Sequence, residues 1–135
     1  MEKFNRLLGE LKKLNFPENE FAVFGSGPMA IRNIKDGDDL DIVVKDKLWK
    51  KLIVSRTIKR SDMGGEKINI GEIEVYRDWM PWFSNSDDLI DKADIIDGIR
   101  FVNLKKVLEW KKSYAREKDL KHVKMIEEYL KKGGN

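Results

Sequence analysis

The chain has 135 residues, of which 41% are hydrophobic and 38% charged, a composition typical of a folded globular domain rather than a disordered segment. It contains no cysteine, which excludes disulfides, zinc–thiolate centres and thiol catalysis. No run of about 18 apolar residues occurs, so we expect a cytoplasmic protein with no membrane contact.

Periodicity of the apolar residues predicts the secondary structure of the N-terminal part. Helical spacing predicts helices over 2–15, about 28–33 and 46–53. Short apolar or alternating runs predict strands over 21–25, 39–44, 57–60, 66–70 and 72–76. Residues 62–65 read Asp-Met-Gly-Gly, which predicts a hairpin between the third and fourth of these strands.

The C-terminal part is expected to be mostly helical. An acidic, aromatic-rich stretch over 78–97, partly helical around 87–93, leads to a short extended segment at 99–102. Two helices follow, the first capped by Asn103. We therefore predict the α/β fold class, with a mixed, twisted sheet and flanking helices. The chain is expected to be one domain over 1–135, with a sheet-containing core over 1–102 and C-terminal helices over 103–135 packed on it.

Charge is unevenly distributed over a modest net charge of +3. Residues 78–98 carry six acidic side chains against one basic, whereas residues 103–135 carry ten basic side chains against five acidic. A basic segment of this kind suits a ligand that bears phosphate groups. A solvated basic helix surface is the competing interpretation, and it is the better one for most of these lysines.

Two carboxylates, Asp39 and Asp41, lie at the start of the predicted strand over 39–44. Side chains two positions apart leave the same face of a strand. Like charges held side by side repel unless a cation lies between them, and oxygen ligands in this arrangement suit Mg²⁺. A turn cap would explain Asp39, but it would not explain Asp41, which lies inside an apolar run.

A Gly-Ser turn precedes the two carboxylates. Gly25 lets the backbone approach another group closely, and Ser26 can cap the following helix, whose free N–H groups attract phosphate. The same residues also suit an ordinary strand-to-helix turn, and both interpretations can hold together. Pro28 removes one N–H group that would otherwise have been available to a phosphate.

The order of these residues resembles the signature of the nucleotidyltransferase superfamily, which includes DNA polymerase beta and the kanamycin-type antibiotic nucleotidyltransferases. There an apolar residue, Gly and Gly or Ser precede Asp, an apolar residue, Asp or Glu and an apolar residue. The matching segments here are Phe24-Gly25-Ser26 and Asp39-Leu40-Asp41-Ile42. The third carboxylate of the family fits Glu74, between Ile73 and Val75, with Glu72 as the competing candidate. Residues 112–119 resemble the Lys…Arg-x-Lys-Asp segment of small stand-alone members.

The resemblance implies an enzyme that transfers a nucleoside monophosphate from an NTP such as ATP to a hydroxyl group, with release of pyrophosphate. It implies catalytic and metal-binding roles for Asp39, Asp41 and Glu74, with two Mg²⁺ ions, or Mn²⁺ in their place. It also implies nucleotide binding by Gly25, Ser26, Lys112 and Arg116, with Lys111 and Lys118 as alternatives to the two basic residues.

Several questions stay open at this point. The acceptor is a small molecule, a protein or RNA, selected by the chain itself, by a homodimer or by a partner protein. A non-catalytic nucleotide- or partner-binding relative, such as a toxin–antitoxin component, is an alternative function, as is a nucleic-acid-binding domain. Trp79, Trp82 and Phe83 either stack on a base or acceptor ring or cover the sheet or a dimer contact. His122, the only histidine, is expected at the surface or beside Asp119.

Overall fold

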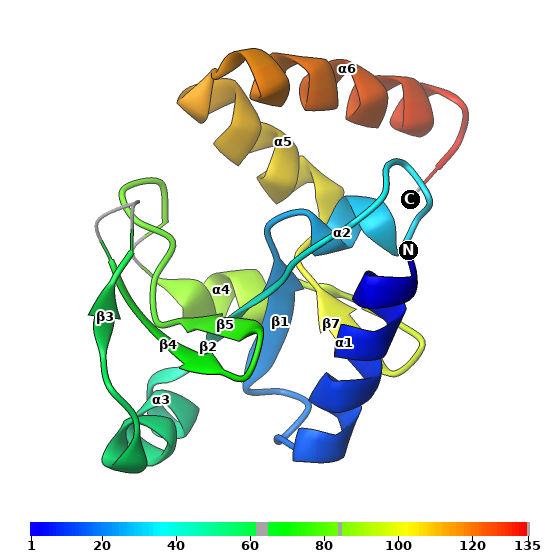
Figure 1. Ribbon diagram of the computed structural model, residues 1–135. Helices are drawn as coiled ribbons and strands as arrows, with labels where there is room; N and C mark the ends of the chain where they lie inside the picture. The colour runs from blue at the N-terminus through cyan, green and yellow to red at the C-terminus, as the bar shows by residue number, and fades with distance from the viewer. Residues whose placement is uncertain (62–64, 84, 135) are drawn as a thin grey trace.

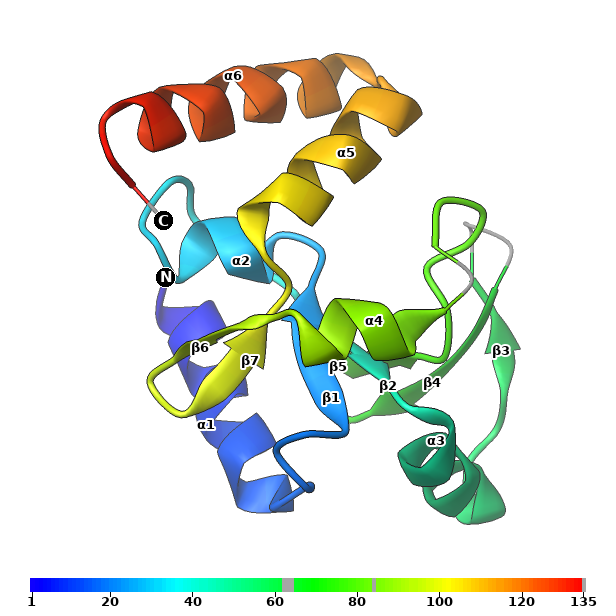
Figure 2. The ribbon, with the colours of Figure 1, turned by 180° about the vertical axis from the view of Figure 1, so that it is seen from behind.

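A computed structural model describes residues 1–61, 65–83 and 85–134, and it contains helices packed on a mixed sheet (Figures 1 and 2). Seven strands hydrogen-bond in the order β3-β4-β5-β2-β1-β7-β6. Their bounds are β1 (Phe21–Phe24), β2 (Leu40–Val44), β3 (Lys59–Arg60), β4 (Glu66–Ile70), β5 (Ile73–Tyr76), β6 (Asp94–Ile96) and β7 (Ile99–Phe101). The predicted α/β class is confirmed.

Six α-helices surround this sheet within the described part of the chain. They are α1 (Glu2–Leu14), α2 (Gly27–Ala30), α3 (Asp46–Leu52), α4 (Ser86–Asp91), α5 (Leu104–Tyr114) and α6 (Glu117–Lys131). A 3-10 turn over Ile53–Ser55 follows α3. In Figures 1 and 2, α1 and α4 lie on opposite sides of the sheet, and α6 crosses above it after α5. No described helix is long and apolar enough to cross a membrane.

The alternation of side chains along the central strand β2 separates two hydrophobic cores. Leu40, Ile42 and Val44 belong to the core that contains the buried residues of α1. Val43 belongs to a second core, built with the aromatic residues that precede α4 and with α5. Asp41 has the parity of Val43, so its carboxylate is directed to the second face, at the end of that core.

Strand pairing places the predicted site at the centre of the sheet. β2 pairs antiparallel with β1 and parallel with β5. β2 is therefore bordered on both sides by other strands, and its backbone groups are used in the ladder. This arrangement fixes the two strands that carry the predicted carboxylates against each other.

The structure departs from the predicted elements in three places. The strand β6 was not predicted, and the strand expected over 57–60 is reduced to Lys59–Arg60. β3 and β4 do pair antiparallel, whereas most of the expected turn, residues 62–64, lies outside the described residues. Finally, Lys112 and Arg116 would share a helical face only if a helix continued between them, and it does not. α5 ends at Tyr114, and Ala115 has a left-handed backbone with φ 55°.

Candidate active site

A cleft of about 420 Å³ lies between the sheet and the C-terminal helices. All the predicted site residues except Lys112 line it, namely Gly25, Ser26, Asp39, Asp41, Glu74 and Arg116. They come from β2 and the residue before it, β5, the β1–α2 turn and the α5–α6 junction. The structure thus brings together residues that are up to 91 positions apart in the sequence.

Asp41 and Glu74 are neighbours across two parallel strands. Their Cα atoms are register partners in the β2–β5 ladder, so their side chains lie beside each other on one face of the sheet. Burial, hydrogen bonding between the two carboxyl groups and the nearby charges of Glu74 and Asp39 raise the pKa of Asp41 well above its usual range. Asp41 Oδ1 is buried and has no hydrogen-bond partner among the described residues, so this oxygen can accept a ligand.

Gly25 approaches the carboxylate of Asp41 from the neighbouring strand end. Its φ of 63° lies in the left-handed region, which is unfavourable for residues that have a Cβ atom. A Cβ atom at this position would lie 2.5 Å from Asp41 Oδ2. Both the conformation and the close approach therefore require glycine at this position.

Glu74 is held by two donors, one on each oxygen. Lys67 Nζ donates to Oε1 at 2.9 Å, and the hydroxyl of Tyr76 donates to Oε2 at 3.0 Å. Burial raises the pKa of Glu74, but the hydrogen bonds from Lys67, Asp41 and Tyr76 outweigh it, and the net pKa is lowered. Lys67 was not predicted as a site residue. The β4–β5 pairing, which puts Lys67 opposite Tyr76, is needed to find it.

Glu72, the competing carboxylate, lies away from the cleft. It precedes β5 and is bound by two cations of α1, with Arg6 Nη2 at 2.7 Å and Lys3 Nζ at 3.8 Å. Its side chain is 53% exposed. The structure therefore brings Glu74, and not Glu72, to Asp41.

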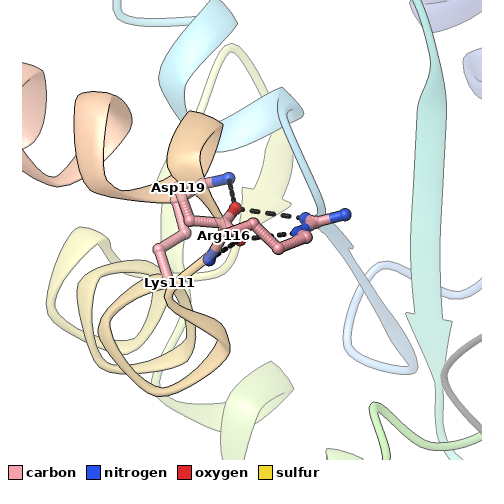
Figure 3. A network of polar contacts seen from close by, with 3 residues as sticks. All are labelled: Lys111, Arg116 and Asp119. Atoms are coloured by element: carbon pink, nitrogen blue, oxygen red, sulfur yellow. Dashed lines mark hydrogen bonds and ion pairs between the residues drawn. The ribbon is translucent and has the colours of Figure 1, made fainter.

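The opposite wall of the cleft is basic and is organised by a buried carboxylate (Figure 3). Asp119 is fully buried and binds two cations. Arg116 Nε lies 2.6 Å from its Oδ2 and Arg116 Nη2 3.1 Å from its Oδ1, while Lys111 Nζ lies 3.5 Å from Oδ1. The Arg116 guanidinium also lies 3.7 Å from the centroid of the Tyr114 ring. These contacts hold both cations in place beside the cleft.

Burial and the ion pair compete in setting the pKa of each member of this network, and the outcome differs between Asp119 and Lys111. Burial raises the pKa of Asp119, but the hydrogen bond from Arg116 and the charge of Lys111 outweigh it, so the net pKa is lowered. For Lys111, burial exceeds the attraction of Asp119 and lowers the pKa to about 8. Lys111 is therefore a cation at neutral pH that lacks full compensation, and an anion in the cleft would supply it.

Lys112 is not brought to the cleft. Its side chain is 53% exposed and lies 3.5 Å from Glu127. The reason is the rotation of successive residues around α5. Lys111 lies on the buried side of this helix with Leu104, Val107 and Trp110, and the next residue is rotated by about 100°. Lys111 and Lys118, the alternatives weighed from the sequence, do line the cleft.

Lys35 and His122 also line the cleft, and sequence reasoning did not assign them to a site. Burial and the nearby charges of Lys111 and Lys35 lower the pKa of His122 to about 4, so its ring is neutral at physiological pH. Its Nδ1 atom is buried, with no hydrogen-bond partner in the part of the chain that the structure describes. The three-residue spacing from Asp119 was the available signal, since it places both residues on one side of α6.

The aromatic residues before α4 pack beneath the cleft. Trp79 is 1% exposed, stacks on Phe24 at 4.5 Å between ring centroids and meets Trp110 at 5.1 Å. Trp82 packs on Tyr114 at 4.6 Å, and Phe83 lies 6.0 Å from Phe24. These contacts are those of rings that cover the sheet, rather than of rings left open to stack on a base or an acceptor.

The donor set of the cleft limits how a metal could be held. Among residues 1–61, 65–83 and 85–134, no group of three or more His, Cys, Asp or Glu side chains is arranged to hold a metal ion. Asp39 is exposed and Asp41 has a free oxygen. A pair of carboxylates completed by water and phosphate oxygens is an arrangement that Mg²⁺ accepts.

No protein-family model matches the chain, and neither a curated protein nor a solved structure gives a significant match. Function must therefore be inferred from the residues of the cleft.

Proposed function

We propose that the chain is a Mg²⁺-dependent nucleotidyltransferase that transfers a nucleoside monophosphate from an NTP to a hydroxyl group. The observation that carries the proposal is the cleft itself, in which the carboxylates Asp41 and Glu74 face a wall formed by Lys111 and Arg116. Carboxylates on one side and fixed cations on the other suit a metal-bound polyphosphate. The resemblance of the Gly-Ser and Asp-x-Asp segments to the nucleotidyltransferase signature supports the same function.

The metal would be held by Asp39 and Asp41. When bound, Mg²⁺ neutralises phosphate charge and lowers the pKa of an acceptor hydroxyl. The raised pKa of Asp41 in the metal-free protein fits this role, because a buried carboxyl beside another carboxyl binds a cation in place of its proton. Ionised Glu74, which accepts hydrogen bonds from Lys67 and Tyr76, would accept the proton of the hydroxyl.

The triphosphate would lie against Lys111, Arg116 and the Gly25-Ser26 turn. Negative charge grows on the pyrophosphate as it leaves, and cations fixed in advance stabilise that charge. Arg116 is already fixed by Asp119 and by the Tyr114 ring. The chain's own part in the reaction is thus to orient the phosphates and to keep these cations in place.

Thermal stability with each of the four NTPs, with and without Mg²⁺, tests nucleotide binding. We expect Mg²⁺-dependent stabilisation of the wild type and its loss in Asp41→Asn. Asp36→Asn is the matched control, because Asp36 is exposed and does not line the cleft. Pyrophosphate release with small-molecule, protein and RNA acceptors then separates an enzyme from a nucleotide-binding protein without turnover. Binding of no NTP under any of these conditions would contradict the proposal.

A further inference from the structure

Both oxygens of Glu74 already accept a hydrogen bond. Lys67 Nζ lies 2.9 Å from Oε1 and the Tyr76 hydroxyl lies 3.0 Å from Oε2. An ion bound to Glu74 would share the carboxylate oxygens with these donors and would lie close to the positive charge of Lys67. By contrast, Asp41 keeps a buried oxygen with no described hydrogen-bond partner.

The side chain of Lys67 is packed against the neighbouring strand rather than extended into solvent. It lies on β4 directly opposite Tyr76 on β5, and its side chain is 20% exposed. Its ammonium group lies 5.9 Å from the centroid of the Tyr76 ring. The side chain therefore stays beside Glu74, and its charge lies on the β4 side of the carboxylates.

Repulsion between positive charges points the same way. Lys67 lines the cleft with four carboxyl groups, those of Asp38, Asp39, Asp41 and Glu74. Its ammonium group already supplies a positive charge 2.9 Å from Glu74 Oε1. A second divalent ion bound to Glu74 would lie close to that ammonium group, and the two like charges would repel each other.

We propose that Lys67 takes the place of a second divalent ion. The cleft then binds one metal ion through Asp39 and Asp41, while Glu74 stays hydrogen-bonded to Lys67 and Tyr76. This inference rests on the proposed function, since it concerns the metal of that reaction. It differs from the two ions that the sequence resemblance implies. Lys67 is a positioning residue, because it acts on the hydroxyl through Glu74.

Counting bound Mn²⁺ tests this inference without measuring activity. The electron paramagnetic resonance signal of free Mn²⁺ gives the number of ions bound per chain, in the presence of one equivalent of a nonhydrolysable ATP analogue. We expect one ion for the wild type and two for Lys67→Met, because the substitution frees Glu74 Oε1 and removes a positive charge. Lys67→Arg keeps the charge and should bind one ion.

Lys59→Met is the matched control. Lys59 is the register partner of Lys67 on β3 and is exposed, so its loss removes the same charge without freeing Glu74, and we expect one ion. Lys67→Gln provides a second neutral replacement should the Met variant fail to fold. Equal ion counts in the wild type and the neutral Lys67 variants would overturn this inference alone. Binding of no Mn²⁺ to the wild type would overturn the proposed function and this inference with it.

Discussion

Gly25 and Asp41 lie so close together that a Cβ atom on residue 25 would be 2.5 Å from Asp41 Oδ2. The backbone of Gly25 is also left-handed, with φ 63°. The two requirements are separate, since one comes from the chain conformation and the other from a neighbouring strand. They can be measured separately because Gly71 shares only the first of them.

We expect Gly25→Ala to destabilise the protein more than Gly71→Ala does. Gly71 has φ 59°, and a Cβ there would meet no atom within 4 Å, so its replacement should cost about 1–2 kcal/mol of unfolding free energy from backbone strain alone. Gly25→Ala adds the contact with Asp41. Urea denaturation of both variants, each also in an Asp41→Ala background, measures the difference. Equal losses for both glycines in the wild-type background would contradict the role given to Asp41.

We expect Asp41→Asn to raise the stability of the metal-free protein at pH 7. The raised pKa of Asp41 means that the native state binds a proton more tightly than the unfolded state. Stability is therefore lost as pH rises above the unfolded-state pKa of about 3.9, and asparagine removes this loss. Urea denaturation with a chelator should show the gain at pH 7 and its disappearance near pH 4. A variant less stable than the wild type at pH 7 would argue against a buried, repelled carboxyl.

We expect Lys111→Met to weaken binding of a nonhydrolysable ATP analogue, whereas Lys112→Met should leave it unchanged. A hydrogen bond to a charged group contributes about 1.5–3 kcal/mol, so the loss should be roughly tenfold to hundredfold. Arg116 still binds Asp119 in the Lys111 variant, so Asp119 keeps a partner. Isothermal titration calorimetry at neutral pH measures both affinities. A similar loss of affinity in both variants would show that the effect comes from the net charge of the protein rather than from the position of Lys111 in the cleft.

We expect the wild type to gain stability relative to Lys111→Met as pH rises from about 8 to about 10.5. Burial lowers the pKa of Lys111 to about 8 from a usual value of 10.5, so in this range the unfolded chain binds more protons than the native one. Stability rises with pH wherever that holds, and the full difference amounts to about 3 kcal/mol. Denaturation of both proteins at several pH values measures it. A difference that does not change with pH would show that Lys111 titrates as an exposed lysine does.

The sequence was sufficient to predict those features of the site that depend on a single strand. The two-residue spacing predicted that Asp39 and Asp41 leave the strand on the same face, and the apolar neighbours of Glu74 distinguished it from Glu72. The first inference needs only the parity of a single strand, and the second needs only the residues on either side of each glutamate. The bounds of α1, β4 and β5 also agree with the predicted ranges to within one residue.

The features that the sequence did not predict depend on contacts between elements that are distant in the chain, or on a helix end without a sequence signal. Lys67 reaches Glu74 because β4 and β5 pair in one particular register, and alternation within β4 alone does not reveal that register. The break between α5 and α6 falls at Ala115, a residue that favours helix. Neither glycine nor proline marks the break. That break puts Arg116 outside α5, so its position relative to Lys112 cannot be read from helical spacing.

The register between β2 and β5 has a consequence for how the protein can fail. Asp41 is paired with Glu74, while Leu40 and Ile42 are paired with Ile73 and Val75. A slip of one residue would turn every side chain of β5 to the other face, moving Glu74 into the apolar core and Val75 into the cleft. Core and cleft would be lost in the same event. A chain with this sheet misaligned would therefore expose apolar side chains and be prone to aggregation. A preparation that contains such chains should differ from a fully folded one in the fraction of molecules that have the cleft, rather than in the properties of each cleft.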